Sequence, residues 1–239
     1  MTPGYKSMAA VAIIQARMGS TRLRGKSLMP LAGVPLLKRV ISSVQRNAFI
    51  NNVIVATSTL PEDDPIEAYC QYLDIDCVRG DSKDVLSRFV KAAEGLPGTD
   101  NIVRVTADNP FNRHDVSADL YETHVTGGYD YTYVDGLSHI AYEVINVGAL
   151  RKIWDSATLN EYHREHVTPY FRDNPEQFKL HCVNSDYEGL RPQTDKLLTV
   201  DSAEDHQRIE KMIIDINYDK QPDMDFNEIY QWLKLNIHQ

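Results

Sequence analysis

A loop rich in positive charge follows a short apolar segment near the start of the chain. Residues 10–14 are all Ala, Val or Ile, and the loop after them holds glycines, hydroxyl side chains and four cations. These loop residues are Gly19, Ser20, Thr21 and Gly25, with the cations Arg17, Arg22, Arg24 and Lys26. Burying such cations together unpaired would be very costly, and glycine lets a ligand approach main-chain N–H groups closely. The loop therefore predicts a cradle for a polyanion, most naturally a triphosphate, with a solvated basic turn as the alternative.

Two aspartates further along the chain each follow a segment that is expected to be a strand. Residues 101–106 lead into Asp108, and residues 196–200 lead into Asp201. Because ligands of open α/β sheets sit at the carboxyl ends of the strands, both carboxylates are expected beside the basic loop. Mg²⁺ prefers a few carboxylates together with substrate phosphates, so these features together predict a metal–triphosphate site. The alternatives are turn formation at Asp108, which precedes Asn-Pro, and helix capping at Asp201.

The elements that must position these residues follow the order of an α/β protein. Short apolar segments alternate with segments whose apolar residues repeat at helical spacing, which predicts a doubly wound, mostly parallel sheet. Strands are expected at 10–14, 52–57, 76–78, 101–106, 129–134, 140–145, 178–183 and 196–200. Helices are expected at 36–44, 62–73, 82–93 with Ser82 as the cap, 147–157, 161–172, 203–215 and roughly 225–236.

Composition and charge restrict the class of protein. The 239 residues are 42% hydrophobic, which supports one substantial core, so we expect a single domain over 1–239 with 127–183 as an insertion over the sheet edge. No apolar run has the length of a membrane-spanning helix, and residues 1–8 do not form a secretion signal. A net charge of -9 argues against a general nucleic-acid binder. Three scattered cysteines indicate a reducing cytoplasm rather than a disulfide scaffold or zinc site.

The basic loop resembles the signature of the CMP-sugar synthetases, cytidylyltransferases that activate 3-deoxy-manno-octulosonate and sialic-type sugars. It is most similar to the branch named after spore coat polysaccharide biosynthesis protein F. The matching loop residues are Ala16, Arg17, Ser20, Arg22, Leu23, Gly25 and Lys26. Arg24 stands where the family usually has proline. Further matches lie at 80–81 with 84–88, 104–110, 164–170 and 199–205, so the resemblance runs from Ala10 to about Asp205.

The resemblance implies a nucleotide-diphospho-sugar transferase-like fold and a Mg²⁺-dependent transfer of CMP from CTP to an acidic sugar or a related acceptor, with release of pyrophosphate. The implied nucleotide-binding residues are Gln15, Ala16, Arg17, Gly19, Ser20, Arg22, Lys26, Ser58 and Arg79. The catalytic set is Arg17, Arg22, Lys26 and Asp108, and the ligands of Mg²⁺, or alternatively Mn²⁺, are Asp108 and Asp201. The residues expected to bind the acceptor are Arg104, Glu143 and His166. Such a transfer depends chiefly on positioning and charge neutralisation.

The resemblance also implies that residues 127–183 supply a sugar pocket and a dimer contact in a homodimer of surface-polysaccharide biosynthesis. Several residues keep alternative interpretations: Arg79 as a surface cation, Glu143 as a solvated strand residue, and His166 with His163 on one helix face. A nucleotide-sugar-dependent glycosyltransferase and a non-catalytic nucleotide-binding homologue are the alternative functions. The first would need an Asp-x-Asp motif just after a strand, whereas Asp74-Ile75-Asp76 precedes one. The residues do not identify the acceptor.

Overall fold

The structure, a computed structural model, describes residues 9–137, 139–184, 192–221 and 226–236. Residues 1–8, where no secretion signal is predicted, lie outside the described residues, as does Asp225 at the start of the last predicted helix.

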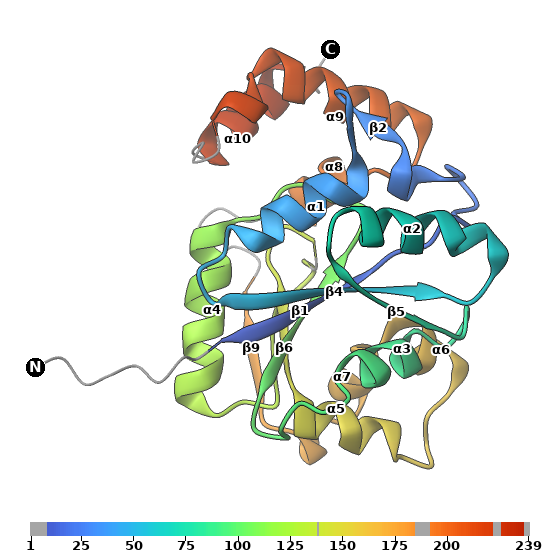
Figure 1. The fold of residues 1–239 in the computed structure, drawn as a ribbon. Coiled ribbons are helices and arrows are strands. Elements are labelled where there is room, and N and C mark those ends of the chain that lie inside the picture. Colours follow the sequence, from blue (N-terminus) through green and yellow to red (C-terminus); the bar gives the residue numbers. More distant parts are fainter. Residues whose placement is uncertain (1–8, 138, 185–191, 222–225, 237–239) are drawn as a thin grey trace, which may run out of the picture.

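A seven-stranded sheet crosses the molecule with the strand order β5-β4-β1-β6-β8-β7-β9 (Figure 1). Its strands are β1 (Ala10–Gln15), β4 (Ile50–Ser58), β5 (Asp76–Gly80), β6 (Asn101–Thr106), β7 (Tyr131–Val134), β8 (Glu143–Asn146) and β9 (Leu180–Val183). The strands from β5 to β6 are parallel, β8 is antiparallel to both of its neighbours, and β9 is parallel to β7. The predicted doubly wound, mostly parallel fold is therefore confirmed. A separate small sheet pairs β2 (Pro30–Leu31) with β3 (Val34–Pro35).

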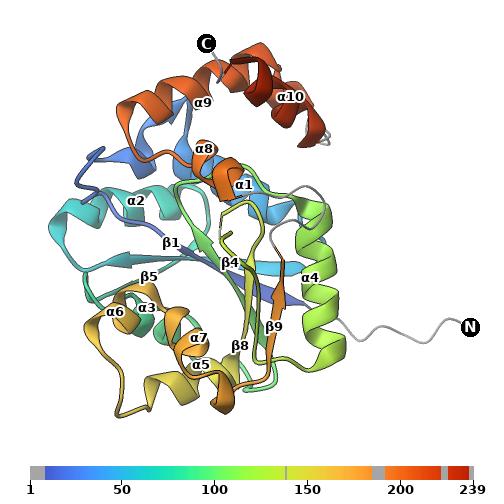
Figure 2. The ribbon, with the colours of Figure 1, turned by 180° about the vertical axis from the view of Figure 1, so that it is seen from behind.

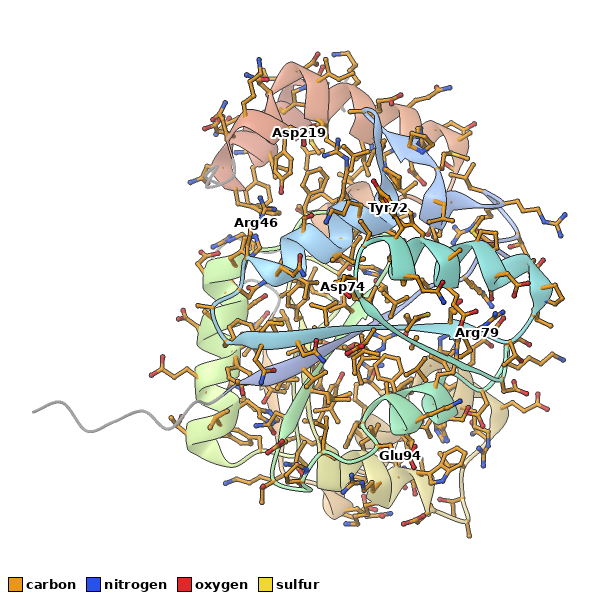
Figure 3. All side chains as sticks on the ribbon, in the orientation of Figure 1. Arg46, Tyr72, Asp74, Arg79, Glu94 and Asp219 are labelled. Carbon is orange, nitrogen blue, oxygen red and sulfur yellow. The ribbon has the colours of Figure 1, made fainter. Side chains whose placement is uncertain are left out.

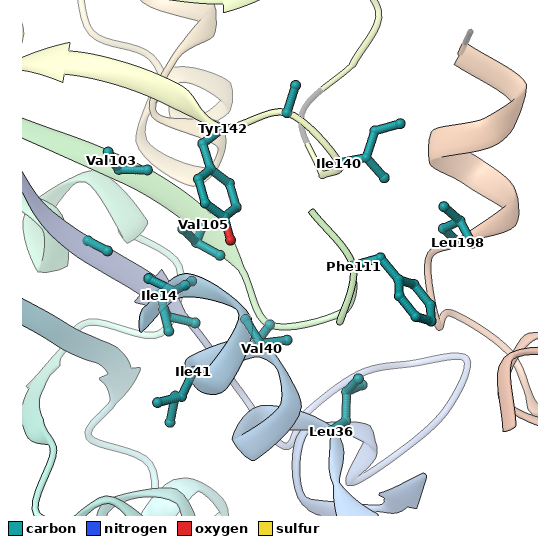
Figure 4. Close-up of a cluster of buried hydrophobic side chains, with 14 of the residues drawn as sticks. Ile14, Leu36, Val40, Ile41, Val103, Val105, Phe111, Ile140, Tyr142 and Leu198 are labelled. Carbon is teal, nitrogen blue, oxygen red and sulfur yellow. The ribbon is translucent and has the colours of Figure 1, made fainter. Parts of the chain in front are cut away.

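Helices cover both faces of the sheet and enclose it between two apolar cores (Figures 1 and 2). One layer contains α1 (Leu36–Gln45), α2 (Asp64–Tyr72) and α4 (His114–Gly127), with α8 (Pro192–Leu197), α9 (Ala203–Asp215) and α10 (Phe226–Asn236) on the same side. The other contains α3 (Val85–Ala92), α5 (Val147–Trp154), α6 (Glu161–His166) and α7 (Pro169–Asp173). Short 3₁₀ turns lie at Lys26–Leu28, Pro61–Asp63, Pro175–Gln177 and Tyr218–Lys220. Figure 4 shows part of the first core, where Ile14 and Val105 of the sheet face Val40 of α1. The central strands are rich in Val, Ile and Ala because both of their faces are buried.

The segment 196–200 is not the predicted strand. It is the end of α8 and the turn that follows. Proline suits the first turn of a helix, where its missing N–H is not needed, and α8 begins at Pro192. Thr199 Oγ1 donates a hydrogen bond to Asp195 O, four residues earlier, at 2.8 Å, as threonine side chains do in helical turns. Asp201 therefore does not follow a strand. Instead, the Val200 N–H donates a hydrogen bond to Asp108 O at 2.8 Å, which holds this turn beside Asp108.

Helix α4 was not predicted from the sequence. Its buried side chains are Val116, Ser117, Leu120, Tyr121 and His124, so the face toward the core includes polar residues. This mixture weakens the apolar repeat that indicates an amphipathic helix.

Two other predicted helices differ at their ends. The helix expected over 161–172 is divided into α6 and α7, because Val167 adopts a φ of 67° and Pro169 begins the next helix. The cap of α3 is Asp84 rather than Ser82, since Asp84 Oδ1 accepts from Ser87 N at 2.8 Å.

Residues 127–183 contribute β7, β8 and β9 and thus complete one side of the main sheet. Their expected roles in a sugar pocket and a dimer contact stay predictions. The cysteines Cys70, Cys77 and Cys182 are free thiols. In the part of the chain that the structure describes, no helix combines the length and apolar character needed to cross a membrane.

Candidate active site

A polar pocket of about 210 Å³ lies where the basic loop meets the end of β6. The loop side of the pocket is formed by Gln15, Ala16, Arg17, Ser20, Thr21, Arg22, Lys26 and Ser27. The remaining wall is formed by Val85 and Arg88 of α3, Thr106, Ala107 and Asp108 at the end of β6, and Glu165 and His166 of α6. The structure thus brings most of the predicted nucleotide-binding residues together with Asp108 and His166.

Main-chain hydrogen bonds and two glycines shape the basic loop. Met18 N donates to Asp63 Oδ1 at 2.6 Å, and Met18 O accepts from Gly25 N at 2.9 Å. Gly25 has a φ of 76°, in the left-handed region that favours glycine. At Gly19 a Cβ atom would lie 2.6 Å from Glu62 Oε1, so glycine allows the loop to pass close to that side chain. Gly19, which is one of the predicted nucleotide-binding residues, does not line the pocket.

Lys26 joins the two carboxylates that the sequence predicts as metal ligands. Its Nζ lies 3.4 Å from Asp108 Oδ2 and 2.9 Å from Asp201 Oδ1, and it also donates to Val200 O at 2.9 Å. Arg22 Nη2 pairs with the other Asp201 oxygen at 2.8 Å. The Lys26 side chain is only 12% exposed, so solvent screens its ion pairs less than those of a surface lysine. Asp108 and Asp201 thus share one cation, although only Asp108 follows a strand.

Asp108 lies in a strongly charged environment. Burial raises the pKa of its carboxyl group, but the charges of His139 and Lys26 outweigh burial, and the pKa lies below its ordinary value. His139 Nε2 is 3.5 Å from Asp108 Oδ1, and His139 Nδ1 is 2.7 Å from Asp195 Oδ2. Burial lowers the pKa of His139, but the carboxylates of Asp195 and Asp108 raise it above the ordinary value overall. The sequence analysis missed His139 and Asp195, since no spacing along the chain relates them to Asp108.

The donor set fits a hard divalent cation. Asp108 Oδ1 is buried and accepts no hydrogen bond from the described residues; its contact with His139 Nε2 at 3.5 Å is an ion pair without hydrogen-bond geometry. Asp201 contacts the same ammonium group as Asp108, so both carboxylates face one position where a positive charge is favourable. Among the described residues there is no group of three or more His, Cys, Asp or Glu side chains that could hold a metal ion. Mg²⁺ commonly uses one or two carboxylates and completes its shell with waters and substrate phosphates.

Ser58 and Arg79, two of the predicted nucleotide-binding residues, do not line the pocket. The Ser58 hydroxyl group donates to Asp63. Arg79 lies beside α2 (Figure 3), where it pairs with Asp64 at 2.6 Å and Glu67 at 2.8 Å. Both side chains thus bind other residues of the protein, and the ion pairs of Arg79 connect β5 to α2.

Arg104 and Glu143 pair with each other inside the sheet. They lie directly opposite on the antiparallel strands β6 and β8 and form a buried ion pair, to which Tyr131 adds a hydrogen bond from its hydroxyl group. Burial and the Glu143 carboxylate hold the pKa of Tyr131 well above its ordinary value. Glu143 is 1% exposed, so its interpretation as a solvated strand residue is wrong. Neither Arg104 nor Glu143 lines the pocket, and their role toward an acceptor stays a prediction.

The two histidines of α6 have different surroundings. His166 lines the pocket beside Glu165, as its predicted role requires. His163 is buried, and its Nε2 lies 2.9 Å from Asp173 Oδ2. Arg88 also lines the pocket; it belongs to the matched segment 84–88 but had no predicted role.

A mostly parallel α/β sheet, a cationic loop after its first strand, and a pair of carboxylates, one of them at the end of β6, together define the nucleotidyltransferase class. A family model described as cytidylyltransferase matches residues 11–231, and the chain belongs to that family. It is 35% identical over 232 residues to the spore coat polysaccharide biosynthesis protein SpsF of Bacillus subtilis, a match that covers 94% of this chain and 93% of the relative.

Solved structures agree with the family. A cytidylyltransferase from Leptospira borgpetersenii superposes with a TM-score of 0.80 at 26% identity, covering 96% of each chain. A CMP:2-keto-3-deoxy-manno-octonic acid synthetase complexed with CTP shares the fold, with a TM-score of 0.65 at 13% identity, over 87% of this chain and 99% of the other. The Asp-x-Asp candidate of the glycosyltransferase alternative does not fit, because Asp76 begins β5 rather than following a strand.

Proposed function

We propose that this protein is a Mg²⁺-dependent enzyme that transfers CMP from CTP to an acidic sugar or a related acid, with release of pyrophosphate. The observation that carries this proposal is the position of Lys26, which lines the pocket together with Asp108 and contacts both Asp108 and Asp201, although Asp201 itself does not line the pocket. The membership in the cytidylyltransferase family supports cytosine as the base.

In this proposal the basic loop holds the leaving pyrophosphate. Arg17, Arg22 and Lys26 would neutralise the charge that develops on the β and γ phosphates while the acceptor oxygen attacks the α-phosphate. Asp108 and Asp201 would hold Mg²⁺, which neutralises phosphate charge when bound. Because Lys26 is already held against Asp108, Asp201 and Val200 O, this part of the site would need little reorganisation in the reaction.

The proposed acceptor is an acid used in a surface polysaccharide or glycoconjugate. Two names support this class: the Bacillus relative is a spore coat polysaccharide biosynthesis protein, and the solved synthetase acts with a keto-deoxy sugar acid. Glu165 and His166 of α6 line the same pocket as the loop and are the expected place for acceptor contacts.

The test is pyrophosphate release with each of CTP, UTP, ATP and GTP, combined with a panel of acidic acceptors and with or without Mg²⁺. We expect release with CTP that requires both an acceptor and Mg²⁺. Equal release with all four nucleotides would refute cytidylyl specificity, and full activity in the presence of a strong chelator would refute the metal requirement. Lys38→Ala, which removes a lysine from α1 outside the pocket, is the matched control for loop variants.

A further inference from the structure

Arg88 is a buried cation in the wall of the pocket. It is 2% exposed, and its guanidinium group makes one long hydrogen bond, from Nη1 to Ala56 O at 3.4 Å. Its Nε is buried with no hydrogen-bond partner among the described residues. The carboxylates of Asp63, Asp81 and Asp84 are near enough to favour its charge, but among the described residues no acidic side chain forms an ion pair with Arg88. A buried guanidinium group without an ion-pair partner lowers the stability of the ligand-free protein.

A second guanidinium group stands close to Arg88. Burial lowers the pKa of Arg88, and repulsion from Arg17 lowers it further. Arg17 also lines the pocket, and it has no ion-pair partner in the described part of the chain. Lys26 and Arg22 differ from this pair, because the carboxylates of Asp201 and Asp108 already neutralise them. Arg17 and Arg88 are therefore the two pocket cations that form no ion pair among the described residues, with Arg88 buried and Arg17 exposed to solvent.

The chain makes specific room for the Arg88 side chain. A Cβ atom at Gly80 would lie 2.7 Å from Arg88 Cγ, which is the inner part of the side chain and has little freedom to move. Gly80 ends β5 without a left-handed φ, so its backbone conformation does not require glycine. A side chain at Gly80 would thus collide with the Arg88 side chain in its present position, which explains the glycine.

We propose that Arg88 and Arg17 together bind one phosphoryl group of the nucleotide triphosphate. A phosphoryl group carries up to about two negative charges and several acceptor oxygens, so it compensates both guanidinium groups at once. A neutral base or a single carboxylate would leave at least one of the two cations uncompensated. The inference rests on the proposed function, and it adds to the loop a phosphate ligand from α3.

The experiment measures binding of CTP, UTP and inorganic tripolyphosphate by calorimetry in Mg²⁺-containing buffer. We expect Arg88→Met to weaken CTP and tripolyphosphate on the order of 30-fold, as for a lost charge-assisted hydrogen bond, and to leave the CTP-to-UTP affinity ratio unchanged. Arg88→Lys keeps the charge and should recover part of the affinity. Lys91→Ala removes an exposed cation from the same helix and should bind like the wild type.

Thermal unfolding separates this role from a structural one. Because the ligand-free protein bears the cost of an uncompensated buried charge, Arg88→Met should unfold at the same or a higher temperature than the wild type while it binds phosphate less well. A purely structural arginine would show the reverse, a lower unfolding temperature with unchanged affinity.

A double-mutant cycle with Gly80→Ala gives an independent test. We expect Gly80→Ala to weaken tripolyphosphate binding in the wild-type background by displacing Arg88, and to have no effect in an Arg88→Ala background. Loss of the CTP-to-UTP preference with normal tripolyphosphate binding would overturn the proposal in favour of a base contact, and a change confined to the acceptor KM would assign Arg88 to the acceptor. Arg88-dependent tripolyphosphate binding in a protein that does not prefer CTP would support this inference while refuting cytidylyl specificity.

Discussion

Asp201→Asn separates the two interpretations of Asp201, a metal ligand and a helix cap. The structure shows that the cap of α9 is Ser202, whose Oγ accepts from Asp205 N at 3.2 Å, so the Asp201 side chain is not needed for capping. Asparagine can still accept the hydrogen bond from Lys26. The substitution neutralises two ion pairs of Asp201. The pair with Arg22, which is 68% exposed, contributes less than about 1 kcal/mol. In the pair with Lys26, the hydrogen bond to asparagine and the Asp108 carboxylate still stabilise the ammonium group. The unfolding temperature should therefore fall by no more than about 2–4 °C.

The effect on activity should be much larger. If Asp201 holds Mg²⁺, loss of its charge should lower kcat on the order of a hundredfold, as for removal of a key electrostatic stabiliser, with partial rescue at high Mg²⁺. Pyrophosphate release at several Mg²⁺ concentrations measures this. Ser202→Ala is the reciprocal control, because it should destabilise the protein by about 1 kcal/mol and leave kcat nearly unchanged. Normal turnover of Asp201→Asn at low Mg²⁺ would refute the two-carboxylate site.

Three further predictions concern the loop, a buried histidine and the assembly. Lys26→Ala should raise the CTP concentration needed for half-maximal rate, and extra Mg²⁺ should not restore the rate, as a titration of both ligands will show. Burial lowers the pKa of His124 to about 4, whereas the unfolded value is about 6.5, so the unfolded chain binds more protons between these values. The free energy of unfolding should therefore fall by about 3 kcal/mol as the pH drops through that range, and urea titrations of His124→Gln should show a weaker dependence. Light scattering at micromolar concentration should find a homodimer, and a monomer would contradict that expectation.

The parts of the site that a local pattern marks were predictable. The composition of the basic loop predicts a polyanion cradle, and the structure places this loop in a polar pocket with Asp108, which follows the strand that residues 101–106 indicate. The central parallel strands were also recognisable, because their continuous apolar residues reflect burial on both faces.

Contacts between distant segments could not be predicted in this way. Arg79 looked suitable for a ligand, but its partners Asp64 and Glu67 belong to a helix whose position the sequence does not give. His139 reaches Asp108 only because the chain folds back near it. Residues 196–200 have an apolar pattern that fits both a strand and a helix end, and the helix that starts at Pro192 decides between them.

The bridge from Lys26 to Asp108 and Asp201 has a consequence for assembly of the native state. Lys26 is 82 residues away from Asp108 and 175 residues away from Asp201 along the chain. Its ammonium group supplies the positive charge that the two neighbouring carboxylates require. Small metal-dependent domains acquire their fold only on loading, because the ion itself holds distant ligands together. Here the Lys26 side chain holds the two carboxylates together, so we expect the protein to fold without a metal ion, and chelating agents to inhibit it without unfolding it.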